Sequence, residues 1–161
     1  MVELLTWLEG SALGEAMRGM GVWTYGVLNL FHVIGIATLF GSIVVLDLRL
    51  LGLWRAVPLR MMATPTLPLA TAGLTVAILS GVCMLATNAI DYIDNPFLLI
   101  KFPAIGLALI NAAALSRVPA WRERHTREPS VVEHRQLAIA GGTSLVCWLA
   151  AISAGRMLGY W

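Results

Sequence analysis

One histidine inside a long uncharged stretch is the residue of this chain best suited to chemistry. His32 lies between Arg18 and Asp47, and no Asp, Glu, Lys or Arg separates those two residues. An ionisable side chain inside a membrane segment is costly, so such residues are functional candidates by default. Imidazole is also the commonest metal ligand in proteins and a common axial ligand of haem iron.

Three roles for His32 follow from its type and position. It could be a neutral ring that hydrogen-bonds across helices to Asn88, Thr75 or Ser80. It could ligate a metal ion or a haem iron, and it could relay protons. The sequence leaves all three open.

Sulfur atoms from the same half of the molecule could complete a metal site at His32. Met84 and Cys83 belong to the second long apolar stretch. Thioether and thiol sulfur suit Cu(I) when combined with imidazole, and Met84 could also be the second axial ligand of a haem b.

Two cations and a tyrosine could hold the acidic groups of a cofactor. Lys101, Arg156 and Tyr160 all fall in the half that contains His32, and they could bind haem propionates or a lipid phosphate. In the alternative, the two cations extend to the membrane interface and pair with Asp91 or Asp94.

Other kinds of chemistry have no visible residues. The chain lacks a Walker loop, a GxSxG string and an HExxH string, so neither nucleotide-dependent nor hydrolytic catalysis is indicated. It also lacks a basic surface interleaved with aromatic residues, which excludes nucleic acid as a partner. If the protein is an enzyme, it is at most a redox subunit.

Four long stretches that are nearly free of charge must position these residues. Hydrophobic residues make up 58% of the chain and charged residues 12%. A spanning helix needs about 20 apolar residues, and the bilayer requires its backbone groups to pair within the segment. We therefore expect an all-α integral membrane four-helix bundle in a single domain, residues 1–161, with spans at about residues 21–47, 66–90, 96–117 and 134–158.

The segments outside the spans have their own patterns. In residues 1–20 acidic and apolar residues alternate, which predicts an amphipathic helix in the membrane interface, broken at Gly10 and capped again by Ser11. Pro65 and Pro68 are expected to lead into the second span. Residues 118–133 are expected to form a cytoplasmic loop with partial helix.

Small residues recur at four-residue spacing in the second and third spans, and this predicts close helix packing. They are Gly73, Ala77 and Gly81, and Ala104, Ala108 and Ala112. Asp47 stands at the carboxyl end of the first span, where a negative charge opposes the helix dipole. It is therefore expected to pair with Arg60 or Arg135.

The basic residues indicate the orientation. Of the eleven Lys and Arg residues, eight lie in the first and third connections: Arg49, Arg55, Arg60, Arg117, Arg122, Arg124, Arg127 and Arg135. The positive-inside rule then makes this side cytoplasmic. We expect a multi-pass protein of a bacterial inner membrane with both termini in the periplasm.

Several strings resemble an uncharacterised bacterial family of small four-span membrane proteins. They are HVIG from His32, FGS from Phe40, LDLRLLG from Leu46 and NPF from Asn95, with Lys101, Asn111, Gly155-Arg156 and Tyr160. The resemblance implies the four-span fold and no particular activity. A more distant likeness links His32 and the small residues after it to copper-resistance D-like domains and cytochrome b561-like bundles.

Those cytochromes hold haem between paired histidines on facing helices, whereas this chain has one histidine within its spans. A haem b here would be ligated by His32 and Met84, be five-coordinate, or lie between the His32 residues of two copies in a homodimer.

These observations lead to one expectation and two alternatives. We expect a cofactor-binding, b-type-cytochrome-like inner-membrane subunit that acts in electron transfer with a periplasmic or membrane partner. The first alternative is a copper-handling or small-solute permease-like protein. The second is a structural subunit of a larger membrane complex.

Overall fold

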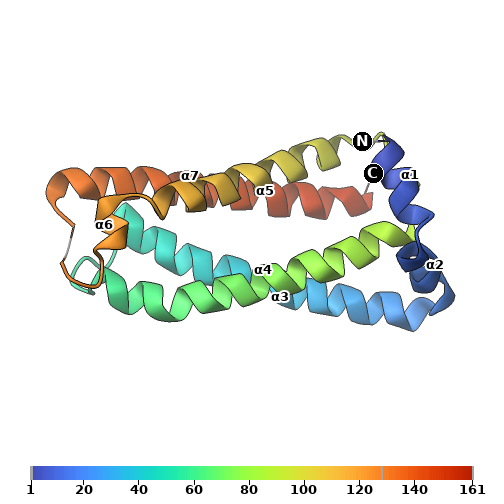
Figure 1. Cartoon of the computed structure of the whole chain (residues 1–161), viewed down its shortest axis with the longest axis horizontal. Coiled ribbons are helices and arrows are strands. Elements are labelled where there is room, and N and C mark those ends of the chain that lie inside the picture. Colours follow the sequence, from blue (N-terminus) through green and yellow to red (C-terminus); the bar gives the residue numbers. More distant parts are fainter. Residues whose placement is uncertain (1, 128, 161) are drawn as a thin grey trace.

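The computed structural model describes residues 2–127 and 129–160, and over these residues it is all-helical (Figure 1). Four helices are long and apolar enough to cross a membrane, which confirms the predicted fold class. They are α3 (Val22–Leu51), α4 (Leu59–Thr87), α5 (Pro96–Leu115) and α7 (Val131–Met157). The short helices are α1 (Val2–Glu9), α2 (Ala12–Gly19), η1 (Ile90–Tyr92), α6 (Pro119–Arg122) and η2 (Leu158–Tyr160).

The four long helices pack as a row, α4–α3–α7–α5, in which each helix contacts its neighbour extensively. Figure 1 shows the α3/α4 pair beside the α5/α7 pair, with both chain ends at the same end of the molecule. We call this end, which carries α1 and α2, the cap end, and the opposite end, which carries α6, the loop end. In the most apolar window of α7, 33% of the residues are buried within the protein, against 11% in α3, so α7 is the more central helix.

Glycines bring α3 and α4 into backbone contact near the middle of both helices. A Cβ atom at Gly73 would lie 2.5 Å from the backbone nitrogen of Leu39 and 2.7 Å from the carbonyl oxygen of Gly35. A Cβ at Gly35 would lie 2.8 Å from the backbone nitrogen of Ala77. Lipid offers no hydrophobic drive for association, so such close contact is what holds helices together. The packing predicted for Gly73 and Ala77 is confirmed.

Helix α7 joins this pair to α5. At the centre, Leu39 of α3, Ala108 of α5 and Trp148 of α7 are buried in one cluster. Towards the loop end, the side-chain amide of Asn111 donates to the carbonyl of Ala140 on α7, at 2.9 Å. This interhelical hydrogen bond satisfies a polar side chain within the apolar layer.

The amino-terminal segment forms two short helices across the cap end. The chain breaks after α1, and the Ser11 side chain accepts a hydrogen bond from the Gly14 N–H, so the predicted cap is confirmed. Leu5 is buried against Ala89 and Leu98. The segment therefore contacts the bundle on one side while Trp7, which is 68% exposed, faces outward.

The second span starts earlier than the sequence suggested. Helix α4 begins at Leu59, so Pro65 and Pro68 lie inside it rather than before it. Proline removes a backbone donor, and in membrane helices neighbouring Ser and Thr side chains help to satisfy the freed carbonyls. Pro65 and Pro68 leave the carbonyls of Met61 and Thr64 without their helical N–H donors, and between the two prolines Thr66 donates its hydroxyl to the carbonyl of Met62 at 2.7 Å.

The other span boundaries shift for identifiable reasons. Helix α3 continues to Leu51 and ends at Gly52, whose φ of 106° is the left-handed conformation that terminates many helices. Helix α7 starts at Val131 because Ser130 and Glu133 form a capping box. The loop predicted for residues 118–133 accordingly contains α6 and ends before α7.

Candidate functional site

His32 contacts α4 through its ring. Its Nδ1 lies 3.0 Å from the hydroxyl oxygen of Ser80. That hydroxyl also lies 2.6 Å from the carbonyl of Val76, and when it donates its hydrogen there, the His32–Ser80 bond is the one of the tautomer in which Nδ1–H donates. In the neutral ring Nε2 then carries the lone pair. A backbone hydrogen bond with Ala77 of α4 also acts on the ring.

Glycine makes room for the ring. A Cβ at Gly81 would lie 3.0 Å from Cε1 of His32, so a larger residue there would push the imidazole away from Ser80. Towards the loop end, the contact between Gly35 and Gly73 closes the space between the two helices. His32 is half-buried in this position. Of the three hydrogen-bond partners considered from sequence, Ser80 is the one that the structure shows.

An open hollow of about 430 Å³ lies at the cap end, between α2, α3, α4 and η1. Its lining includes Met17, Arg18, Tyr25, Met84, Asn88 and Tyr92. Burial, together with the nearby Tyr25 and Asp91, raises the pKa of Tyr92 above its usual value. Its hydroxyl therefore stays neutral at ordinary pH and can donate a hydrogen bond into the hollow.

Met84 borders the hollow and lies one helical turn from Ser80, the residue that contacts His32. It follows Ser80 by four residues on α4, and helical residues at that spacing lie on the same face. Cys83 is half-buried on the same turn. Across the described residues no group of three or more His, Cys, Asp or Glu side chains could hold a metal ion. The described His, Cys, Asp and Glu side chains alone therefore do not form a three-ligand metal site at His32.

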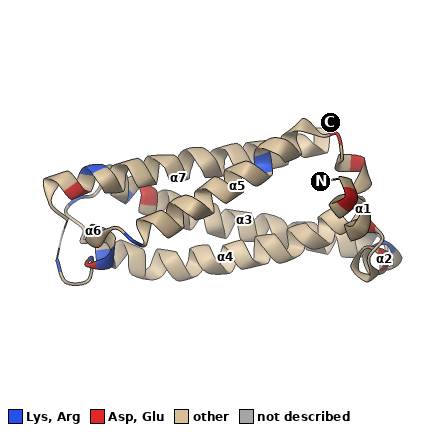
Figure 2. Cartoon of the chain, turned by 45° about the horizontal axis from the view of Figure 1, so that its top comes forward, with Lys and Arg blue, Asp and Glu red and all other residues tan. Residues whose placement is uncertain are grey.

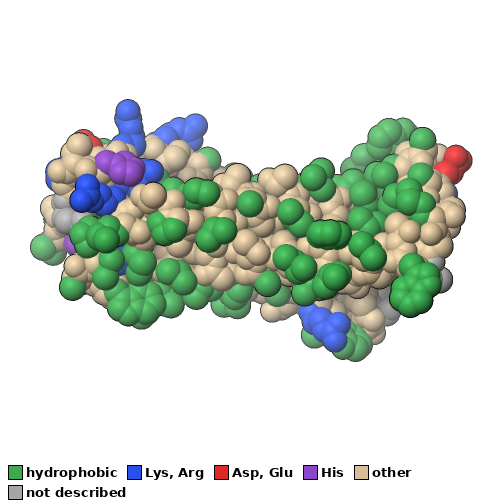
Figure 3. Space-filling model, turned by 90° about the horizontal axis from the view of Figure 1, so that it is seen from below, with side chains coloured by type: hydrophobic (Ala, Val, Ile, Leu, Met, Phe, Trp, Pro, Cys, Tyr) green, Lys and Arg blue, Asp and Glu red, His purple; other side chains and the backbone are tan. Residues whose placement is uncertain are grey.

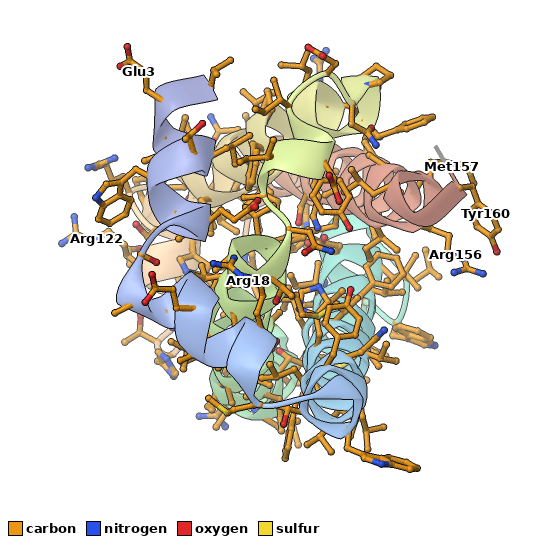
Figure 4. The ribbon with its side chains drawn as sticks, turned by 90° about the vertical axis from the view of Figure 1, so that its right-hand side faces the viewer. Glu3, Arg18, Arg122, Arg156, Met157 and Tyr160 are labelled. Atoms are coloured by element: carbon orange, nitrogen blue, oxygen red, sulfur yellow. The ribbon has the colours of Figure 1, made fainter. Side chains whose placement is uncertain are left out.

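The predicted cations take different positions. Lys101 is half-buried on α5, where its ammonium lies 3.5 Å from the position of a Cβ at Gly155 on α7. Its charge acts electrostatically on His32. Arg156 instead stacks over the ring of Tyr160, 4.6 Å from its centre, and donates to its hydroxyl. Figure 4 shows the side chains of Arg156 and Tyr160 pointing away from the bundle, so the structure does not bring these two residues to His32.

Asp47 lacks the cationic partner expected from sequence. It is 4% exposed, and its Oδ2 has no hydrogen-bond partner among the described residues. Arg60 and Arg135 are exposed and form no ion pair with it. The contact that remains is with the Ser144 side chain on α7, where Gly141 lets the two helices approach closely. The expectation of an ion pair was wrong because the side chains of Arg60 and Arg135 are exposed at the surface, whereas Asp47 is buried between helices.

Sequence reasoning missed two residues that border the hollow, Met17 and Arg18. They come from the carboxyl end of α2, and Gly21, with a φ of 80°, follows them at the turn into α3. Gly21 was the feature of the sequence that could have indicated them, because a sharp turn with positive φ favours glycine.

Comparison with known proteins gives the family. A family model described as "Family of unknown function (DUF6644)" matches residues 4–161, which is nearly the whole chain. The chain belongs to this family. No curated protein and no solved structure matches it. The expected relation to an uncharacterised family is thus confirmed, whereas the likeness to copper-resistance D-like domains and cytochrome b561-like bundles finds no support.

Proposed function

We propose that this protein is a cofactor-binding subunit of the bacterial inner membrane that takes part in electron transfer, with Nε2 of His32 as a ligand of the metal centre. The observation that carries the proposal is the Nδ1–H bond from His32 to Ser80. Metal-ligating histidines typically donate their other ring N–H to a protein oxygen, which fixes the tautomer and the ring orientation. Ser80 supplies this oxygen.

The donor groups available suit a haem b. Nε2 of His32 would be one axial ligand, Met84 lies one helical turn from Ser80, and Lys101 supplies positive charge on the same side. The glycine contact on the loop-end side of His32 leaves no room there for a porphyrin between α3 and α4. A haem would therefore approach from the cap end. When bound, it would supply one-electron chemistry, while the chain orients the ligand and limits access of water.

Copper is the second candidate, and the hollow favours it. Met17 and Met84 both border the hollow, so two methionines from different helices line one space, and Met84 follows Ser80, the partner of His32, by one helical turn. Soft sulfur ligands with one imidazole select Cu(I).

The orientation forms part of the proposal. Lys and Arg side chains gather at the loop end, around α6, and Figure 2 shows this asymmetry along the molecule. By the positive-inside rule the loop end faces the cytoplasm and the cap end faces the periplasm. His32 and the hollow would then be accessible to a periplasmic or membrane redox partner.

The visible spectrum and the metal content of the purified protein test the proposal. Wild-type protein isolated from bacterial membranes should carry a Soret band or stoichiometric copper, and His32→Ala should remove either one. His125→Ala is the matched control, because His125 is an exposed histidine of the loop. A band lost in His32→Ala and kept in His125→Ala supports haem at His32, and the same pattern in copper content supports the second candidate.

A colourless, metal-free wild-type protein from cells supplied with haem and copper would overturn both candidates. The His32–Ser80 bond would then be an interhelical contact of a structural subunit.

A further inference from the structure

A second hollow, of about 500 Å³, lies at the loop end, far from His32 along the bundle. It is formed by the end of α5, the start of α6 and the first turns of α7. Its lining residues are Ala114, Arg117, Val118, Pro119, Gln136 and Ile139. The hollow therefore has one cationic side chain, one amide and otherwise apolar walls.

Arg117 is the cation of this hollow, and the residues that the structure describes do not neutralise its charge. Arg117 is exposed, and no side chain of the described residues forms an ion pair or hydrogen bond with it. Two described acidic residues of the same end, Glu123 and Glu133, instead bind Arg127 at 2.6 and 2.7 Å. These two carboxylates raise the pKa of Arg127 and so keep its charge.

Other cations surround the hollow and strengthen its positive potential. Arg124 lies over the ring of Trp121, 4.5 Å from its centre, and donates to the Trp121 carbonyl. Arg122 and Arg135 are exposed. A basic pocket of this kind beside membrane helices attracts acidic lipid headgroups.

The walls of the hollow are apolar surfaces that face the bilayer. Ile139 is 62% exposed and Ala114 is also exposed, although both lie on spanning helices. Figure 3 shows a similar pattern on one face of the molecule, where most basic side chains gather at one end, one further basic group lies toward the other end, and apolar side chains lie along the length. A cation above an apolar groove matches a molecule with an anionic head and a hydrocarbon chain.

We propose that this hollow binds an anionic phospholipid, with the phosphate at Arg117 and Gln136 and an acyl chain along Ala114 and Ile139. Charge complementarity selects an anionic head, and the apolar walls favour a lipid over a free phosphate ion. The proposal does not depend on His32 or on any cofactor.

Native mass spectrometry of the full-length protein tests the site with two variants and a control. The protein is released from detergent micelles that contain equal amounts of phosphatidylglycerol and phosphatidylcholine. Wild type should retain phosphatidylglycerol preferentially. Arg117→Gln should lower its retention about fivefold, as expected for loss of one basic residue at a membrane surface. Arg60→Gln, an exposed arginine of the same end that does not line the hollow, should change retention little.

The second variant separates a lipid site from an anion site. Ala114→Trp leaves the charge unchanged but fills the groove at an exposed position, so it should reduce lipid retention without disturbing the fold. Equal retention of both lipids by wild type, or equal losses in Arg117→Gln and Arg60→Gln, would overturn the proposal. So would normal retention by Ala114→Trp together with displacement of the lipid by inorganic phosphate, which would indicate an anion site alone.

Discussion

Ser80 uses one hydroxyl for two purposes, and this sets the chemistry available to His32. Its hydrogen goes to the carbonyl of Val76, and its lone pair accepts from Nδ1 of the imidazole. The ring is thereby held against α4. Serine at this position thus joins α3 and α4 through the imidazole ring.

Removing that hydroxyl should weaken the helix pair by a measurable amount. Ser80→Ala is expected to lower the free energy of unfolding by about 0.5–1.5 kcal/mol, the range for interhelical hydrogen bonds in membranes. Unfolding in mixed micelles would measure it. Thr71→Ala is the control, because the exposed Thr71 hydroxyl bonds only to the carbonyl of Leu67 on its own helix. Equal effects of the two changes would show that the His32–Ser80 bond contributes nothing specific.

Asp47 is a buried carboxyl, and none of the described residues forms an ion pair with it. Asp47→Asn keeps the shape of the side chain and its contact with Ser144 while removing any charge. The free energy of unfolding should stay within about 1 kcal/mol of wild type or rise, because no ion pair of the described residues is broken. Breaking a buried ion pair typically costs about 3–5 kcal/mol. A loss of that size would show that Asp47 has a cationic partner after all.

Helix pairs in this protein depend on backbone contact at a few glycines. The α3/α4 pair meets at Gly35 and Gly73, and α7 approaches α3 at Gly141. At these points neighbouring backbone, rather than a movable side chain, occupies the space where a Cβ would stand. The helices therefore cannot yield locally, and one methyl group should alter their separation.

Gly73→Ala should destabilise the bundle by about 1–3 kcal/mol, the usual range for overpacking. Its Cβ would lie 2.5 Å from the Leu39 nitrogen. Gly106→Ala makes the same chemical change on α5, where nothing lies within 4 Å, so alanine's better helix propensity should leave stability equal or higher. Thermal unfolding of the two variants compares them directly. Matching losses would mean that α3 and α4 do not meet at Gly73.

The α1–α2 cap is held by side-chain contacts with backbone groups of α4 and the turn that follows it. Arg18 donates to the carbonyls of Thr87 and Glu9, and the Glu9 carboxylate accepts from the Ile90 N–H at 2.7 Å. These contacts hold the cap over the hollow. The cap can therefore be loosened without unfolding the long helices.

Arg18→Gln should speed amide hydrogen exchange in residues 2–20 about tenfold, since it removes charge-assisted hydrogen bonds. Exchange in α3, α5 and α7 should change little. Glu15→Gln is the control, because this exposed residue of α2 forms no side-chain bond to another described residue. Faster exchange throughout the bundle would show that the cap and the bundle unfold as one unit.

Over the whole protein, basic and acidic side chains are distributed unevenly along the long axis. Basic side chains gather at the loop end and acidic residues of α1 and α2 lie at the cap end (Figure 2). This distribution implies an orientation in the membrane that internal packing does not fix.

Cysteine labelling checks that orientation. A membrane-impermeant maleimide added to intact spheroplasts should label Thr6→Cys, in exposed α1, and should label Thr126→Cys, in the exposed loop, only after lysis. The native Cys83 and Cys147 lie inside spanning helices, so the parent protein gives the background signal. Labelling of Thr126→Cys in intact spheroplasts would reverse the proposed orientation.

The length of the hydrophobic stretches and the spacing of small residues predicted much of the fold of this protein. Four apolar stretches of about 20 residues or more predict four helices, because a helix pairs all of its backbone groups within a single segment. Gly73 and Ala77 marked the α3/α4 contact, and Ser11 marked the start of α2. These features are local along one helix, so they can be recognised without knowing its neighbours.

Only the tertiary structure decided which side chains of different helices lie close to one another. Three partners were available to His32 from sequence, and the glycine contact fixed the register that brings Ser80 to its ring. The same packing left Asp47 without an arginine and turned Arg156 outward. Relative rotation and sliding of whole helices decide such pairings, and one helix's residue pattern restricts them only loosely. The two hollows depend on the same arrangement, since each is bordered by elements that are separate in the chain.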